Sequence, residues 1–168
     1  MLRRSTLIKS GPDRSFTFSI AGDWFSNFVM ACNGDVAYVK EPLCYYRIHR
    51  GNETAESEYN LLGIFEHYQL IHTFLMIAKG HNMQKTIARY QDAIEKLGSM
   101  CLRYALKMLK EEENDVAHRY LLLAPVLKRN IVTDEKYQKL LSYVSLHNIE
   151  LKKAIEAFDS EYNLNRST

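Results

Sequence analysis

The sequence predicts a mainly α-helical protein, in which an antiparallel helical bundle follows a small α/β piece. Two observations lead to this prediction. After about residue 52, apolar residues recur at intervals of three and four positions, which is the periodicity of amphipathic helices. The first 52 residues instead contain short runs rich in Val, Tyr and Ile, together with two of the three prolines, which is typical of mixed α/β structure.

The composition excludes several classes of function and location for this fold. The chain has 168 residues, 46% of them hydrophobic, which is enough to bury the core of one ordinary domain. Its formal charge of only +2 does not provide a basic face for phosphate backbones, so nucleic acid is not an expected partner.

The location of the protein is also indicated by the sequence. The three cysteines are scattered along the chain, which fits reduced thiols better than a framework of disulfides. No segment has the roughly 18 consecutive apolar residues of a membrane span, and the N-terminus lacks the apolar region of a secretory signal, so a cytoplasmic location is expected.

The α/β piece is expected to hold one short helix and two strands. Asp23 is a residue type that caps helix N-termini, and Gly34 suits the left-handed residue that commonly follows a helix. These two residues predict a helix that runs from Asp23 to about Asn33. Residues 35–40 and 43–49 are rich in β-branched and aromatic residues and are predicted to be strands, with Pro42 in the connection between them.

Four longer helices are expected in the bundle. Their apolar seams cover residues 61–78, 83–108, 115–128 and 137–162. Pro125 should kink or shorten the third helix. The last range fits one long helix or two helices joined near residues 147–148, and one helix is the favoured interpretation. The connections are short, so neighbouring helices are expected to run antiparallel.

Several motifs follow one another in the first 56 residues. They are Ile-Ala-Gly-Asp-Trp at 20–24, Asn-Gly-Asp-Val-Ala-Tyr-Val at 33–39, Glu-Pro-Leu-Cys-Tyr-Tyr-Arg-Ile-His at 41–49 and Asn-Glu-Thr at 52–54. Their order and spacing resemble the C-terminal part of the catalytic domain of family 2 glycosyltransferases, which have the GT-A fold. In that family an acidic pair or a Gly-Asp-Trp opens a helix, and a Pro-Leu-x-x-Tyr-Arg-x-His segment closes the domain.

The resemblance implies a set of site residues. Asp23 matches the catalytic base, a carboxylate that accepts the proton of the acceptor hydroxyl as its oxygen attacks the anomeric carbon. Gly22 stands where many members of the family have Glu. Trp24 would offer its ring to the acceptor sugar. Arg47 and His49 match the Tyr-Arg-x-His element, where both would meet the diphosphate and His49 would bind a divalent metal that carries it.

Each of these residues also has an ordinary structural interpretation. Asp23 could be a helix cap and no more, and Trp24 is more commonly a packed aromatic. Arg47 and His49 could form the polar face of an edge strand, because residues two apart on a strand point to the same side. His67 and His72 are five positions apart and do not share a helix face, which disfavours a metal site between them.

The sequence lacks one element that the family requires. It contains no Asp-x-Asp, the motif that holds the metal, Mg or Mn, on the diphosphate of the nucleotide sugar. We therefore expect the C-terminal portion of an inverting glycosyltransferase, with residues 1–56 as the remnant of the GT-A domain and residues 57–168 as the helical bundle. Such a portion is expected to be inactive alone and to carry no metal by itself. The alternative is a non-catalytic helical module for protein interaction.

The expected partners follow from these interpretations. The complete enzyme would take a nucleotide sugar as donor and a glycan as acceptor, as in surface polysaccharide synthesis. A missing sheet would leave apolar surface exposed around Phe16, Phe18 and Ile20, and this surface would favour homodimerisation. Lys107 and Lys110, or Lys128 and Arg129, are small basic clusters of the kind that makes peripheral contact with anionic membranes, although such clusters are usually plain surface.

Overall fold

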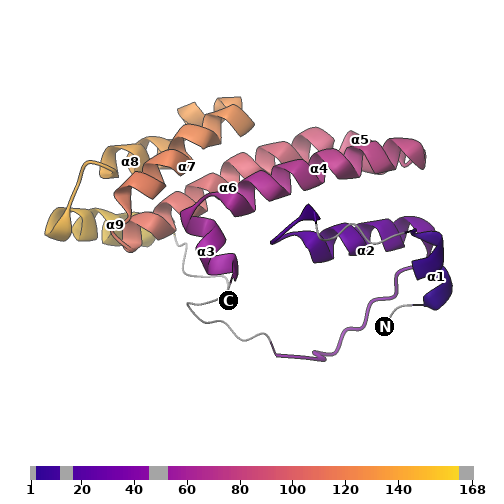
Figure 1. Cartoon of the computed structure of the whole chain (residues 1–168). Coiled ribbons are helices and arrows are strands. Elements are labelled where there is room, and N and C mark those ends of the chain that lie inside the picture. Colours follow the sequence, from indigo (N-terminus) through magenta and orange to yellow (C-terminus); the bar gives the residue numbers. More distant parts are fainter. Residues whose placement is uncertain (1–2, 12–16, 46–52, 163–168) are drawn as a thin grey trace. The chain divides into compact units, whose positions relative to one another are not determined.

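The computed structural model describes residues 3–11, 17–45 and 53–162 (Figure 1). These residues are mainly helical, and no strand occurs among them. The chain divides into two compact units, Met1–Gln91 and Asp92–Thr168. These units are defined by how each one packs within itself. They do not test the domain boundary predicted after residue 56, which stays a prediction. In the described part of the chain, no helix combines the length and the apolar character needed to cross a bilayer.

The core of the first unit lies between two of its helices. The helices of this unit are α1 (Arg4–Lys9), α2 (Gly22–Asn33), α3 (Glu53–Tyr59), α4 (Leu62–Gly80) and α5 (Gln84–Ala88). Phe18, Ala21 and Phe25 pack with Leu70 of α4 in a buried cluster. Phe28 of α2 stacks on Phe74 of α4, with ring centroids 3.9 Å apart. The apolar face of α2 is therefore covered by α4.

The short helix predicted before residue 34 is confirmed, and it ends at Asn33 as expected, but its predicted N-cap and the left-handed conformation expected at Gly34 are wrong. Ala21 is the N-cap of α2, so Asp23 lies inside the first turn and not at the cap. Gly34 follows the helix with an extended backbone, φ −167°, instead of a left-handed one. A Cβ at Gly34 would lie 2.9 Å from Oγ1 of Thr6 in α1. Glycine at this position permits the close approach of α1 to the end of α2.

The first predicted strand is not present, and this corrects the expected α/β piece. Residues 35–40 form neither strand nor helix, and the same holds for residues 43–45 of the second predicted strand. Residues 46–49 lie outside the described part of the chain. Val36, Tyr38 and Leu43 are 78%, 87% and 78% exposed. High β-propensity is not enough for a strand, because a strand needs a neighbour that pairs with its backbone.

The first helix of the second unit is α6 (Tyr90–Lys110). Its first two residues, Tyr90 and Gln91, still belong to the first unit. It is followed by α7 (Asn114–Leu127), the 3₁₀ helix η2 (Arg129–Thr133), α8 (Glu135–Tyr143) and α9 (Asn148–Tyr162). The α6 face predicted from the sequence is buried, with Leu97, Cys101 and Met108 at most 3% exposed. At Gly98 a Cβ would lie 2.6 Å from Cβ of Lys128 and 3.0 Å from the Ala124 oxygen. The helices α6 and α7 therefore approach closely at this glycine.

Two of the predicted long helices are interrupted. The range 83–108 is divided between α5 and α6 by a tight turn at Arg89, whose N–H donates to the Thr86 oxygen. The range 137–162 is two helices and not the favoured single one. Asn148 has φ +52°, a left-handed backbone that does not continue a helix. Before it, Nδ2 of Asn114 donates to the oxygens of Val144 and Leu146, at 2.9 Å each.

Candidate functional site

Asp23 and Trp24 project from the first turn of α2 into solvent. The Asp23 side chain is exposed, and its Oδ1 accepts a 2.8 Å hydrogen bond from the backbone N–H of Trp24. The Trp24 side chain is 61% exposed, so the interpretation of Trp24 as a core aromatic is wrong. A carboxylate and an indole ring are thus accessible side by side at one end of a helix.

The start of α2 is held by a buried carboxylate from α4. Oε1 of Glu66 accepts a 2.7 Å hydrogen bond from the N–H of Ser19. Its Oε2 accepts from the N–H groups of Ile20, at 2.7 Å, and Ala21, at 3.1 Å. Glu66 is only 7% exposed. Burial raises its pKa, but the hydrogen bonds from Ile20, Ser19 and Ala21 outweigh burial and leave the pKa below its ordinary value.

This contact determines where the candidate site lies in the first unit. Ala21 immediately precedes α2, and Asp23 follows it by two residues, so Glu66 fixes the backbone from which Asp23 and Trp24 project. A carboxylate beside a helix N-terminus also interacts favourably with the helix dipole. In the sequence, Glu66 interrupts the apolar residues of the helix predicted over residues 61–78. An acidic residue among the apolar residues of that helix was the signal that could have identified it.

His67, the next residue of α4, lies beside Trp24. Their ring centroids are 6.3 Å apart in an edge-to-face arrangement. Nδ1 of His67 donates to the backbone oxygen of Gly63, so in the neutral ring Nε2 is an acceptor. His67 was considered in the sequence only as a metal ligand. The structure instead places its imidazole next to the exposed indole of Trp24, at the edge of the surface that Asp23 and Trp24 form.

The remaining predicted site residues cannot be placed beside Asp23. Arg47 and His49 lie outside the described residues, as does Phe16. Within the described ranges, no three His, Cys, Asp or Glu side chains form a group that could hold a metal ion. His49, the predicted metal ligand, lies outside these ranges, so the expected Mg or Mn ion is not assigned to any described residue.

Phe18 does not belong to the apolar surface that was expected around Phe16, Phe18 and Ile20. Phe18 is only 6% exposed because it packs against Phe25 in the core between α2 and α4, with ring centroids 5.6 Å apart. Ile20 is half-buried. Exposed apolar side chains of this unit include Trp24 and several side chains in residues 36–45.

Comparison with known proteins does not identify the chain. No protein-family model matches it, and neither the curated proteins nor the solved structures compared with it gave a match. The site is therefore interpreted from its own chemistry. An exposed carboxylate can accept a proton, and an exposed indole can cover the C–H face of a sugar ring.

Proposed function

We propose that this chain is the C-terminal portion of an inverting glycosyltransferase that transfers a sugar from a nucleotide sugar to a glycan acceptor in surface polysaccharide synthesis. One observation supports this proposal. Asp23 and Trp24 are both accessible in the first turn of α2, and hydrogen bonds to Glu66 hold the backbone at the start of this helix. Asp23 accepts the proton of the acceptor hydroxyl while that oxygen attacks the anomeric carbon, and Trp24 packs against the acceptor sugar. The ordered motifs of the first 56 residues favour the same assignment.

The remaining parts of this site belong to the complete enzyme. There, Arg47 meets the diphosphate, His49 meets the diphosphate or the divalent metal that carries it, and the Asp-x-Asp of the nucleotide-binding half holds that metal. Residues 1–56 then end a GT-A domain, in which the exposed residues 35–45 pair with the edge of its sheet. Their exposed Val36 and Tyr38 side chains support such pairing, because β-rich segments without a partner leave apolar surface in water. The portion alone transfers no sugar.

The second part of the proposal concerns the helical region. Residues 57–168 form the antiparallel bundle that follows the catalytic domain. The enzyme acts in the cytoplasm, with peripheral contact to the membrane through basic side chains. The buried seam of α6 supports a bundle, and the composition supports the location.

Acceptor binding can be tested on the chain itself. Trp24 is its single tryptophan, so the fluorescence of this residue reports on ligands that cover its ring. Oligosaccharide fragments of bacterial surface polysaccharides should change the emission in a saturable way. A sugar series that leaves the emission unchanged at millimolar concentration would remove the support for an acceptor site at Trp24.

Catalysis must be tested in the complete enzyme. Asp23→Asn should abolish transfer and leave the fold intact, because the amide keeps the shape and loses the basicity. Asp35→Asn is the matched control, since Asp35 is also exposed and lies just beyond α2. Turnover of the Asp23→Asn enzyme near the unmodified rate would rule out Asp23 as the base. The gene upstream should encode the Asp-x-Asp that this chain lacks.

The exposed segment after α2 favours one second candidate, a non-catalytic helical interaction module. Tyr38 and Leu43 are 87% and 78% exposed, as expected of residues that a partner or a second copy covers. Sedimentation equilibrium and the Trp24 titration together separate the two functions. A concentration-dependent dimer that Tyr38→Ser and Leu43→Ser convert to monomer, together with no response of Trp24 to glycans, would favour the interaction module.

A further inference from the structure

A half-open cavity of about 480 Å³ lies in the second unit, between side chains of α6, α8 and α9. Its volume is within the usual range of small-molecule sites. Leu102 and Leu106 of α6, Leu140 of α8 and Phe158 of α9 form its apolar floor. Leu106, Leu140 and Phe158 are 8%, 1% and 2% exposed. The floor therefore belongs to the packed core of the unit.

The rim of the same cavity is basic. Arg103, Lys107 and Lys110 follow one another at intervals of four and three residues along α6, and Lys136 of α8 faces the cavity as well. This spacing places the three α6 cations on one side of the helix. Among the described lining residues the single carboxylate is Asp134.

Most of these charged groups, Lys107 and Lys136 included, already have partners within the protein. Oδ1 of Asp134 accepts a hydrogen bond from the backbone N–H of Lys136 at the start of α8. Lys110 forms a 2.6 Å ion pair with Asp159. Arg103, which is exposed, is therefore the cation best placed to meet a ligand from solvent.

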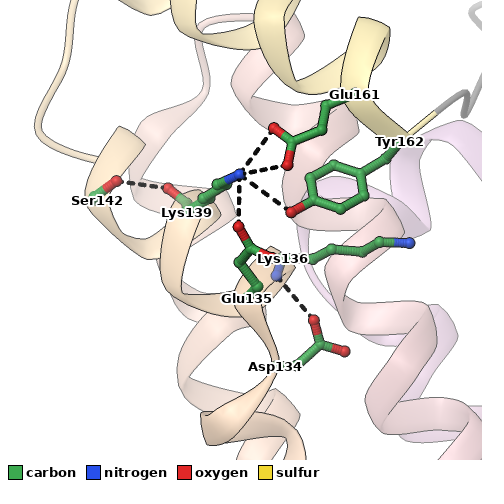
Figure 2. A network of polar contacts seen from close by, with 7 residues as sticks. All are labelled: Asp134, Glu135, Lys136, Lys139, Ser142, Glu161 and Tyr162. Carbon is green, nitrogen blue, oxygen red and sulfur yellow. Dashed lines mark hydrogen bonds and ion pairs between the residues drawn. The ribbon is translucent and has the colours of Figure 1, made fainter.

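The walls of the cavity are fastened by a polar network (Figure 2). Nζ of Lys139 in α8 contacts Glu161 of α9 at 2.7 Å and Glu135 at 2.9 Å, and it donates to the Tyr162 hydroxyl at 3.2 Å. The Lys136 ammonium lies 4.8 Å from the centre of the Tyr162 ring. Lys139 neutralises acidic groups of α8 and α9 and joins two of the helices that line the cavity.

We propose that this cavity binds a single anionic amphiphile, with a phosphate headgroup at Arg103 and an aliphatic chain on the leucine floor. The guanidinium of Arg103 suits phosphate because it can donate two parallel hydrogen bonds. An inorganic anion alone would leave the apolar floor uncovered. A neutral lipid would leave the basic rim unused. The proposal concerns the second unit alone and does not depend on the assignment of Asp23.

The full chain can be titrated calorimetrically with decyl phosphate, below the concentration at which it forms micelles. Decyl maltoside presents the same chain on a neutral headgroup, and inorganic phosphate presents the headgroup without the chain. Decyl phosphate should bind at least about tenfold more tightly than either of them. Arg103→Gln should weaken its binding by about tenfold, whereas Arg119→Gln, which changes an exposed arginine of α7 outside the cavity, should not.

A change in the floor gives an independent check. Leu102 is only half-buried, so Leu102→Asn should be tolerated by the fold, which circular dichroism verifies. This variant should weaken decyl phosphate and leave any weak binding of inorganic phosphate unchanged.

Four results would overturn the proposal. They are equal affinity for inorganic phosphate, equal affinity for decyl maltoside, equal weakening by Arg103→Gln and Arg119→Gln, and binding to vesicles that contain phosphatidic acid without binding to monomeric decyl phosphate. The first would indicate a simple anion site and the second an apolar one. The third would indicate general charge attraction, and the fourth would indicate a membrane surface.

Discussion

Oε2 of Glu66 in α4 accepts a 2.7 Å hydrogen bond from the backbone N–H of Ile20, a residue 46 positions earlier in the chain. The same carboxylate also accepts from Ser19 and Ala21. Backbone N–H groups at the start of a helix have no partner within the helix, and a side chain that satisfies them from another helix joins the two elements. Glu66 thereby ties α2, and with it Asp23, to α4.

The first prediction concerns the stability of this joint. Glu66→Gln keeps the size of the side chain but replaces one acceptor oxygen by a donor NH₂ that cannot accept from a backbone N–H. We expect a loss of about 1–3 kcal/mol in the free energy of unfolding of the first unit. Urea denaturation followed by Trp24 fluorescence measures this loss.

Glu56→Gln is the matched control, because Glu56 is an exposed glutamate of α3 in the same unit. Its substitution should change stability by no more than about 0.5 kcal/mol. Equal stability of the Glu66→Gln and Glu56→Gln proteins would show that the three hydrogen bonds do not hold α2 in place.

The second prediction is the pH dependence of the same contact. Burial raises the pKa of Glu66, but the backbone hydrogen bonds lower it by more than burial raises it. The pKa therefore lies below its ordinary value of 4.5. A group whose pKa is lower in the folded state contributes stability above its unfolded pKa and loses it as the pH falls through the folded pKa. The first unit should therefore lose stability below about pH 4.5.

Denaturation at about pH 6 and about pH 3.5 tests this dependence. The difference in stability between the two conditions should be smaller in Glu66→Gln than in the unmodified protein, because glutamine does not titrate. An unchanged difference would assign the acid sensitivity to other carboxylates.

The longer helices could be predicted from the sequence because they depend on local periodicity, whereas the short helices α1 and α3 were not predicted. The seams that bury Ile64 and Ala78 in α4, and Leu97 and Cys101 in α6, follow intervals of three and four residues that can be read without any tertiary information. Phe65 and Tyr68 share the predicted α4 seam but are exposed. Pro125 was expected to kink or shorten its helix, and α7 ends two residues after it, at Leu127.

The features that could not be predicted depend on residues far apart in the chain. The split between α8 and α9 coincides with a contact from Asn114, 30 residues before Val144. The role of Glu66 depends on residues 45 to 47 positions away. The segment 35–40 has strong β-propensity but no strand to pair with, because propensity describes one segment and pairing requires two. In the candidate site, the motif located Asp23 and Trp24, and only the fold added Glu66 and His67.

The third prediction concerns the close approach of α6 and α7. Gly98→Ala would place a methyl group 2.6 Å from Cβ of Lys128 and 3.0 Å from the Ala124 oxygen, so the two helices must shift. We expect a destabilisation of the second unit by about 1–3 kcal/mol. Thermal unfolding followed by far-ultraviolet circular dichroism would detect it.

Gly80→Ala provides the control for glycine replacement. A Cβ at Gly80, the last residue of α4, has no neighbouring atom within 4 Å, so this variant should be neutral or slightly more stable. If Gly98→Ala is also neutral, α6 and α7 do not pack as closely as Gly98 implies.

The last prediction uses the thiols as probes of the two units. Cys101 has no exposed surface, and burial raises the pKa of its thiol to about 12. Thiolate is the reactive form, so Cys101 should be modified only when the second unit opens. Cys44, which is exposed, should react with iodoacetamide at once. Burial also raises the pKa of Cys32, a partly buried thiol 3.6 Å from Sδ of Met83, so Cys32 should react at an intermediate rate.

Peptide mass spectrometry of samples quenched over time distinguishes the three cysteines. Gly98→Ala should accelerate the modification of Cys101 and leave that of Cys44 unchanged, because it loosens the packing around α6 alone. Modification of Cys101 as fast as that of Cys44 in the native protein would contradict the buried seam of α6, and with it the packed core that forms the floor of the proposed amphiphile site.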